Sequence, residues 1–148
     1  MDTLETIAAG IRGEQRTVER LDLLVTYCAG WSKLNEHIIR SAVADEFLWD
    51  DPEEGRIQKK GLGTLVPKLK NKIDTLRHGS KSTPYLTLSD LVIDRNRSIT
   101  TIWACFAVPA TKIEGMTQIR VRDNGVISER RAYRALPLTR VAGIHSRR

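Results

Sequence analysis

The chain has 148 residues, of which 41% are hydrophobic and 28% charged, and its formal net charge is +6 at pH 7. This length suffices for one domain with a buried core and is short for two, so a single domain over 1–148 is expected. No stretch approaches the roughly 20 apolar residues of a membrane span, and the acidic first residues do not match a leader peptide. We therefore expect a soluble, cytoplasmic protein.

The cysteines and histidines do not form a recognisable metal or redox motif. Cys28 and Cys105 lie far apart, and neither belongs to a C-x-x-C motif or stands beside clustered histidines. The histidines are spread over a helix, a loop and the C-terminal tail, without the spacing of metal ligands. The sequence therefore predicts no metal and no cofactor.

The excess of positive charge raises the question of an anionic partner, because clustered basic residues attract phosphate groups. Lysines gather between Lys59 and Lys72, and arginines lie on a late strand and in a basic tail over 138–148. Aromatic residues make up only 5% of the chain and do not alternate with basic ones, which leaves no platform for base stacking. A solvated basic surface is predicted, with nucleic-acid binding as the less favoured interpretation and no membrane partner.

The first half of the chain has a helical pattern. Apolar residues recur every three or four positions between 14 and 33, which predicts a core-facing helix over that range. Gly13 is expected to interrupt it, because glycine inside a helix costs about 1 kcal/mol relative to alanine, and this leaves 1–13 as an N-terminal extension. Asn35 is predicted to be the N-cap of a second, shorter helix. The apolar residues of that helix are Ile38, Ile39, Ala42, Val43 and Phe47.

A third amphipathic helix is predicted between about 62 and 77, with Gly79 as its stop signal. Pro67 leaves two alternatives for the start of this helix. If Thr64 is the N-cap, the proline lies in the first turn, where its missing N–H is harmless. If the helix begins at Gly61, the proline should kink it.

Beyond residue 80 the pattern changes to four β-rich runs, over 85–93, 99–108, 113–121 and 126–136. Asp123-Asn124-Gly125 tolerates positive φ and predicts a hairpin. With a short strand over 47–49, these runs predict an α+β fold in which three N-terminal helices pack on one face of a curved antiparallel sheet. Both faces of the run 99–108 are apolar, so a homodimer packed through the free sheet face is expected.

One acidic residue is a candidate for chemistry, within Trp49-Asp50-Asp51-Pro52. An acid fixed by an adjacent proline and flanked by aromatic residues suits a carboxylate placed in an apolar pocket, and Asp51 is that carboxylate. The alternative is that both aspartates simply form the turn before Pro52.

Several segments, in their order and spacing, carry a resemblance to a known superfamily. They are Tyr27 eight residues before Asn35, the run from Ala44 to Pro52, Gly61, and Asn124 to Ile127 followed by Arg131-Ala132-Tyr133. Over roughly residues 18–136 the chain resembles the nuclear-transport-factor-2-like superfamily, in its SnoaL-like polyketide cyclase and ketosteroid isomerase branch. The resemblance implies a cystatin-like α+β cone that encloses a pocket, and a dimer.

The same resemblance implies roles for particular residues. Asp51 matches the position of the isomerases' general base, and Tyr27 that of their oxyanion-stabilising tyrosine. Thr117 stands where the isomerases carry a second, protonated acid. Ala132 stands where the cyclases and the related limonene epoxide hydrolases carry a catalytic acid or base.

The resemblance also places the side chains of Arg130 and Arg134 inside the pocket, with extension to the solvent as the alternative. The other candidate substrate-binding residues are Thr117, Trp31, Phe47, Trp49 and Trp103. Ordinary core packing is the alternative for the aromatic residues at 31, 47 and 49. The first hypothesis is a cofactor-independent, isomerase- or cyclase-like acid/base enzyme acting on a small hydrophobic carbonyl compound. The second is a non-catalytic ligand-binding or dimeric association module of the same fold.

Overall fold

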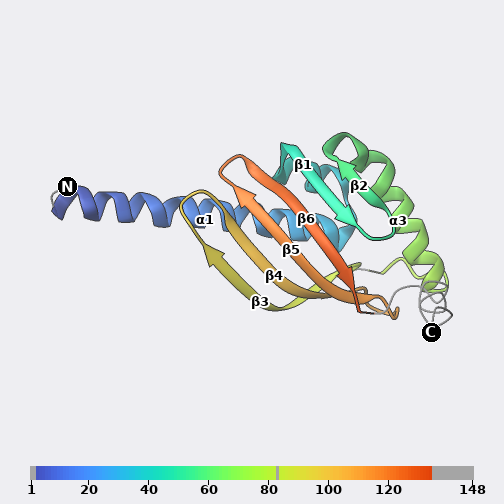
Figure 1. Ribbon diagram of the computed structural model, residues 1–148. Coiled ribbons are helices and arrows are strands. Elements are labelled where there is room, and N and C mark those ends of the chain that lie inside the picture. The colour runs from blue at the N-terminus through green and yellow to red at the C-terminus, as the bar shows by residue number, and fades with distance from the viewer. Residues whose placement is uncertain (1–2, 83, 135–148) are drawn as a thin grey trace, which may run out of the picture.

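The computed structural model describes residues 3–82 and 84–134, which form three α-helices and one six-stranded sheet (Figure 1). In chain order the elements are α1 (Thr3–Lys33), α2 (Glu36–Ala42), β1 (Val43–Asp51), β2 (Gly55–Gln58), a 3-10 turn (Lys59–Gly61), α3 (Leu62–Leu76), β3 (Thr87–Arg95), β4 (Thr100–Ala107), β5 (Glu114–Arg122) and β6 (Gly125–Tyr133). This confirms the α+β fold class. The predicted tail over 138–148 lies outside the described residues.

The strands follow the order β2-β1-β6-β5-β4-β3 across the sheet. Neighbouring strands are antiparallel except β1 and β6, which run parallel. The chain leaves the β1–β2 hairpin, passes through α3 and builds β3 to β6 as a meander whose last strand returns beside β1. The sheet is therefore mixed and mostly antiparallel, whereas the sequence pattern predicted antiparallel pairing throughout. Helix α1 crosses behind β4, β5 and β6 (Figure 1).

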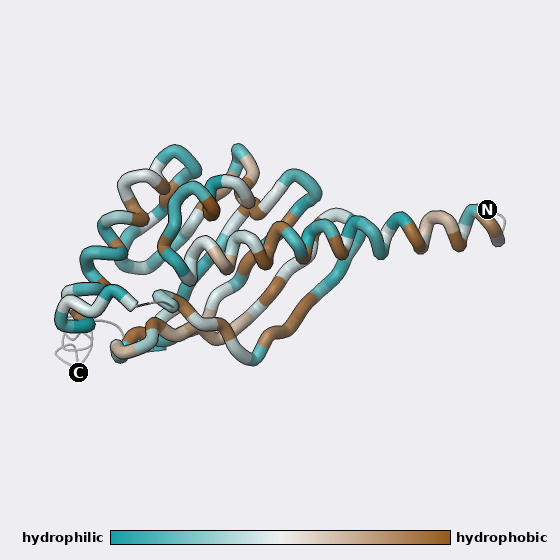
Figure 2. Tube along the Cα trace, turned by 180° about the vertical axis from the view of Figure 1, so that it is seen from behind, coloured by the Kyte–Doolittle hydropathy of each residue, from teal (hydrophilic) through white to brown (hydrophobic). Residues whose placement is uncertain are grey.

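Helix α1 is one helix of 31 residues, so the predicted break at Gly13 is wrong. A cost of about 1 kcal/mol is small against the packing of the C-terminal half of the helix. That half buries Leu24, Tyr27 and Trp31, whereas the N-terminal half projects beyond the sheet (Figure 2). Among the described residues no helix, α1 included, combines the length and the apolar character needed to cross a membrane.

The predicted N-cap at Asn35 is confirmed, because its side chain accepts a hydrogen bond from the backbone N–H of Ile38 at 3.2 Å. Helix α2 is shorter than predicted and ends at Ala42. The following strand β1 takes up residues that the sequence analysis gave to the helix, namely Val43 and Phe47, and it is longer than the predicted 47–49. Helix α3 begins at Leu62, so Pro67 lies inside it, as in the second alternative.

The two faces of the sheet differ in burial. On the inner face, Ile102 and Ile119 are fully packed against the helices. On the outer face, Val92, Trp103 and Met116 are 61%, 36% and 56% exposed. Val92 pairs directly opposite Trp103, and Met116 lies on the next strand. The apolar outer face predicted from the two-sided pattern of β4 is therefore present.

Candidate functional site

An apolar cavity of about 860 Å³ lies between α3, the end of α1 and the inner face of β4 and β6. Its walls include Trp31, Leu69, Phe106, Arg131 and Tyr133. Small-molecule sites in proteins usually measure about 300–1,000 Å³ and combine apolar walls with a few polar groups. The cavity has both the size and the composition of such a site.

A bulge in β6 decides which of its side chains face this cavity. The pairing of β6 with β5 shifts by one residue between Val126 and Ser128, so Ile127 is an extra residue on β6. An extra residue reverses the alternation of the side chains beyond it. The inward-facing side chains beyond the bulge are Glu129, Arg131 and Tyr133.

Glu129 lies at the centre of a buried hydrogen-bond network and is 1% exposed. The Tyr27 hydroxyl donates to its Oε1 at 2.5 Å, and the Thr117 hydroxyl donates to its Oε2 at 2.6 Å. Arg131 Nε donates to the same Oε2 at 2.8 Å and forms an ion pair with it. Buried charges are tolerated when they are paired and hydrogen-bonded, and both conditions hold here.

The protonation of this network follows from burial and from the Glu129 carboxylate. Burial raises the pKa of Tyr27 well above its usual value, and the negative charge of Glu129 raises it further. Burial on its own lowers the pKa of Arg131, but the attraction of Glu129 outweighs it and the pKa of Arg131 is raised. At neutral pH the phenol is therefore a neutral donor, and the guanidinium carries its full charge.

Aromatic rings surround the Arg131 guanidinium, whose carbon lies 4.7 Å from the Trp31 ring centroid, 5.0 Å from that of Trp49 and 5.3 Å from that of Phe106. Trp31 and Trp49 stack on each other with centroids 5.5 Å apart. Three buried N–H donors in this cluster have no hydrogen-bond partner among the described residues. They are Trp31 Nε1, Trp49 Nε1 and Arg131 Nη2. Such donors are costly to leave unpaired, and their concentration beside a cavity indicates room for an acceptor.

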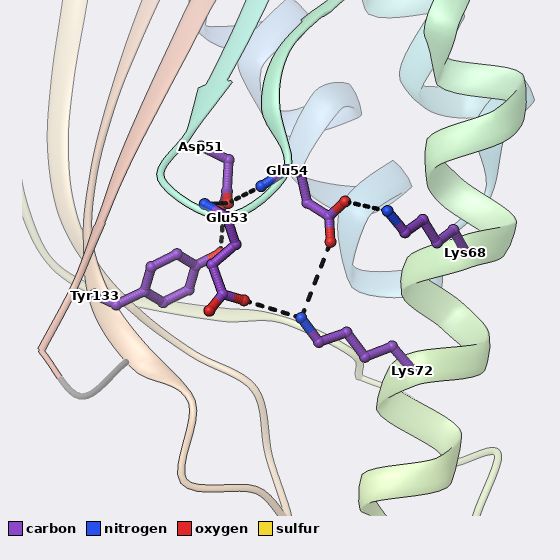
Figure 3. A network of polar contacts seen from close by, with 6 residues as sticks. All are labelled: Asp51, Glu53, Glu54, Lys68, Lys72 and Tyr133. Atoms are coloured by element: carbon purple, nitrogen blue, oxygen red, sulfur yellow. Dashed lines mark hydrogen bonds and ion pairs between the residues drawn. The ribbon is translucent and has the colours of Figure 1, made fainter. Parts of the chain in front are cut away.

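Asp51 is also buried, and its two oxygens have different partners (Figure 3). Oδ1 accepts from the backbone N–H groups of Glu53 at 2.8 Å and Glu54 at 3.0 Å. Oδ2 accepts from the Tyr133 hydroxyl. Burial raises the pKa of Tyr133, and its hydrogen bond to Asp51 adds to the rise. Asp51 therefore shapes the turn, as the turn interpretation held, and also touches a cavity residue.

The turn after Asp51 is joined to α3 by two ion pairs, drawn in Figure 3. Glu54 meets Lys68 at 2.6 Å, and Glu53 meets Lys72 at 3.0 Å. Glu53 and Lys72 also line the cavity. Across the part of the chain that the structure describes, no three histidine, cysteine, aspartate or glutamate side chains gather as a possible metal site.

Solved structures share this arrangement of helices and sheet. An NTF2-like protein with a cystatin-like fold from Novosphingobium aromaticivorans superposes with a TM-score of 0.65 at 11% identity, over 96% of this chain and 97% of that one. A cystatin-like fold protein from Burkholderia xenovorans gives 0.58 at 12% identity, over 83% and 95% of the two chains. An NTF2-like protein of unknown function from Shewanella baltica gives 0.58 at 11% identity, over 82% and 96%. The chain has the NTF2-like, cystatin-like fold.

The comparisons establish the fold and leave the activity open. No protein-family model and no curated protein sequence matches this chain. Identities this low report architecture, and one fold hosts many unrelated functions. The cystatin-like cone predicted from the sequence is confirmed, while the SnoaL-like or isomerase branch stays a prediction.

Within this NTF2-like fold, the two predicted catalytic residues do not bond to each other. The Tyr27 hydroxyl donates to Glu129, and Asp51 accepts from Tyr133. The oxyanion donor expected from the resemblance is therefore engaged by a carboxylate of its own. The catalytic roles of both residues stay predictions.

The predicted substrate-binding residues divide into two groups. Trp31 lines the cavity, Trp49 stacks beneath it, and Thr117 binds Glu129. Phe47 packs edge-on against Tyr27 in the core. The remaining predicted residues, Trp103, Arg130 and Arg134, lie on the outer face or beyond the strand end, with 36% of Trp103 and 70% and 80% of the two arginine side chains exposed.

The inward placement expected for Arg130 and Arg134 is wrong because of the bulge at Ile127, which exchanges the two faces of β6. The side chains that take their place at the site are Glu129, Arg131 and Tyr133. A compositional signal was present in the sequence. The set Ser128, Arg130, Ala132 and Arg134 contains no large apolar residue, as is typical of a face that meets solvent.

Proposed function

We propose that the protein binds a small, mostly apolar carbonyl compound in the cavity, and that the carbonyl oxygen accepts a hydrogen bond from the cluster of Arg131 and the two tryptophans. The observation that carries this proposal is the group of three buried, unpartnered N–H donors beside an apolar cavity. A carbonyl oxygen with two lone pairs supplies the missing acceptor, and the apolar walls favour the remainder of the ligand.

A neutral acceptor suits this site better than an anion. The charge of Arg131 is already matched by Glu129 at 2.8 Å, so a second carboxylate would add an unpaired buried charge. Arg131 Nη2 is itself shielded in the empty protein. The ligand oxygen reaches it through a small displacement of the surrounding side chains, for which the adjacent cavity leaves space.

The test compares ketones with their parent hydrocarbons, such as 1-tetralone with tetralin and a steroid-sized pair. Trp31 and Trp49 supply the fluorescence signal, because one lines the cavity and the other stacks on it. We expect at least one ketone to bind about tenfold more tightly than its hydrocarbon, a difference of about 1.4 kcal/mol. Equal affinities within every pair would contradict the proposal.

A double variant, Glu129→Gln with Arg131→Met, removes both charges together and avoids leaving one buried alone. It should lose the preference for the ketone and keep affinity for the hydrocarbon. Arg134→Met is the matched control, because its side chain is 80% exposed and pairs only with Glu114 at 3.3 Å. A preference unchanged in the double variant would remove Arg131 from ligand recognition.

A second candidate function, acid/base catalysis on the bound carbonyl compound, is favoured by one observation. The Tyr133 hydroxyl lines the cavity and donates to the buried Asp51 carboxylate. A proton leaving the carbon next to the carbonyl can pass to the Tyr133 oxygen as the phenol proton passes to Asp51. Arg131 then stabilises the enolate oxygen. This arrangement supports the isomerase-like branch of the fold with a different donor from the one predicted.

The catalytic candidate is tested by following deuterium uptake at the α-carbons of the bound ketone by NMR. We expect Asp51→Asn to abolish the exchange while ligand affinity stays within about twofold. Asp45→Asn is the matched control, because Asp45 lies on the same strand with a fully exposed side chain. Absence of exchange in the unmodified protein would leave binding without catalysis.

We also propose that two copies pack through the outer sheet face, where Val92, Trp103 and Met116 are exposed. Sedimentation should show a dimer that Trp103→Glu dissociates and Trp103→Phe retains. A monomer at micromolar concentration would contradict this proposal.

A further inference from the structure

A second hollow lies at the other end of the molecule, between the middle of α1 and the turn that joins β3 to β4. Its volume is about 430 Å³, and it shares no lining residue with the apolar cavity. The residues that line it include five arginines and no acid. These arginines are Arg12, Arg16, Arg20, Arg95 and Arg97.

Arg20 is the structural member of the group and is 2% exposed. Its Nε donates to Asp123 at 2.7 Å, and its two Nη atoms donate to the backbone carbonyls of Asn96 at 3.0 Å and Arg97 at 2.7 Å. The Asn96 side chain closes the turn by accepting from the backbone N–H groups that follow it. Arg20 therefore fixes the turn against α1 and holds the two flanking arginines beside the helix.

The other four arginines are exposed, and their guanidinium groups make no hydrogen bond or ion pair within residues 3–82 and 84–134. Arg12 and Arg16 are one helical turn apart, about 6 Å along the axis. Arg95 and Arg97 are separated by a similar distance along an extended chain. Four like charges around one hollow repel one another, so a bound anion would stabilise the fold.

We propose that this hollow binds a small molecule carrying two or more linked phosphate groups, recognised through the phosphates. Guanidinium groups pair bidentately with phosphate oxygens. The two arginine pairs come from different elements, and a ligand with more than one phosphate group can engage both of them.

The composition of the hollow favours a small ligand over a nucleic acid strand. No aromatic side chain is among the residues that line it, so a base has no ring to stack on. Its volume also lies within the range of small-molecule sites.

The test is isothermal titration of the full chain with inorganic pyrophosphate, inorganic phosphate and a single-stranded oligonucleotide. We expect one pyrophosphate per chain, bound at least tenfold more tightly than phosphate, with an affinity that falls as salt rises. The double variant Arg12→Gln with Arg97→Gln should weaken pyrophosphate binding at least tenfold. Arg134→Gln, an exposed arginine at the opposite end of the sheet, should leave it unchanged.

A thermal melt guards against a folding defect. The double variant keeps Arg20, so its melting temperature without ligand should equal or exceed that of the unmodified chain, and pyrophosphate should raise the melting temperature only of the unmodified chain. Equal affinities for phosphate and pyrophosphate, or pyrophosphate binding unchanged in the double variant, would overturn the proposal. Tighter binding of the oligonucleotide, lost in the same variant, would assign the hollow to nucleic acid and overturn it as well.

Discussion

Glu129 and Asp51 are buried carboxylates on the same face of the sheet, 1% and 2% exposed, and different kinds of groups hold them. Glu129 accepts from three side chains, one of which is the cationic Arg131. Asp51 accepts from two backbone N–H groups and from Tyr133. One carboxylate is thus half of a buried ion pair, and the other is part of a turn.

This difference separates what each residue does for the fold from what it can do for a ligand. Glu129 neutralises Arg131, so neither charge can be removed alone without leaving the other unpaired among aromatic rings. Asp51 has no cationic partner of its own, and its Tyr133 contact faces the cavity. Glu129 is therefore the structural acid of the site, and Asp51 is the acid with a route to a ligand.

The largest expected effect follows from Glu129→Leu, which leaves the Arg131 charge buried and unpaired. We expect a loss of about 3–5 kcal/mol in the free energy of unfolding, measured by urea titration. Replacing both residues by leucine should cost less than the single change. A single variant as stable as the double one would show that the two charges are not coupled.

Tyr27→Phe removes one donor to the Glu129 carboxylate and should cost about 1.5–3 kcal/mol of stability. It should also alter the alkaline part of the stability profile. Burial and Glu129 raise the pKa of Tyr27 above its ordinary value of 10.0, so its contribution is complete below about pH 10 and is lost as the pH rises toward the folded-state pKa. The variant should lose less stability between pH 10 and pH 11 than the unmodified chain. Equal slopes in that window would contradict this assignment.

Asp51→Ala should cost about 1–2 kcal/mol, because the N–H groups of Glu53 and Glu54 lose their acceptor. Asp51→Asn retains an acceptor oxygen and should cost less. Thermal unfolding of the two variants measures the difference. Equal losses would mean that the turn does not depend on that oxygen.

The smallest expected effect concerns the ion pair between Glu53 and Lys72. Lys72→Met should change stability by about 0–1 kcal/mol, because the lysine side chain is 40% exposed and water screens the pair. Urea titration gives the value. A loss above 2 kcal/mol would show that this clamp stabilises the fold far more than an ordinary surface pair.

Local sequence signals predicted most elements of the fold. The helix periodicity, the Asn35 cap and the β-rich runs after residue 80 depend on neighbouring residues, and the structure confirms them. The break at Gly13 was wrong because a modest local cost was outweighed by packing further along α1. Local propensity sets where an element tends to form, and tertiary packing decides its ends.

The site was harder to predict because it depends on one bulge and on distant partners. The extra residue at Ile127 reverses the faces of β6, and strict alternation gives no sign of it. The bond between Tyr27 and Glu129 joins positions 102 residues apart. Asp51 was found from its own neighbourhood, whereas its partner Tyr133 lies 82 residues away.

The central claim is that the Arg131 cluster donates a hydrogen bond to a ligand's carbonyl oxygen. Infrared difference spectroscopy of a carbon-13-labelled ketone in the cavity measures that bond directly. The C=O stretching frequency should be lower in the unmodified protein than in the variant carrying Glu129→Gln and Arg131→Met. The same frequency in both proteins would contradict the account.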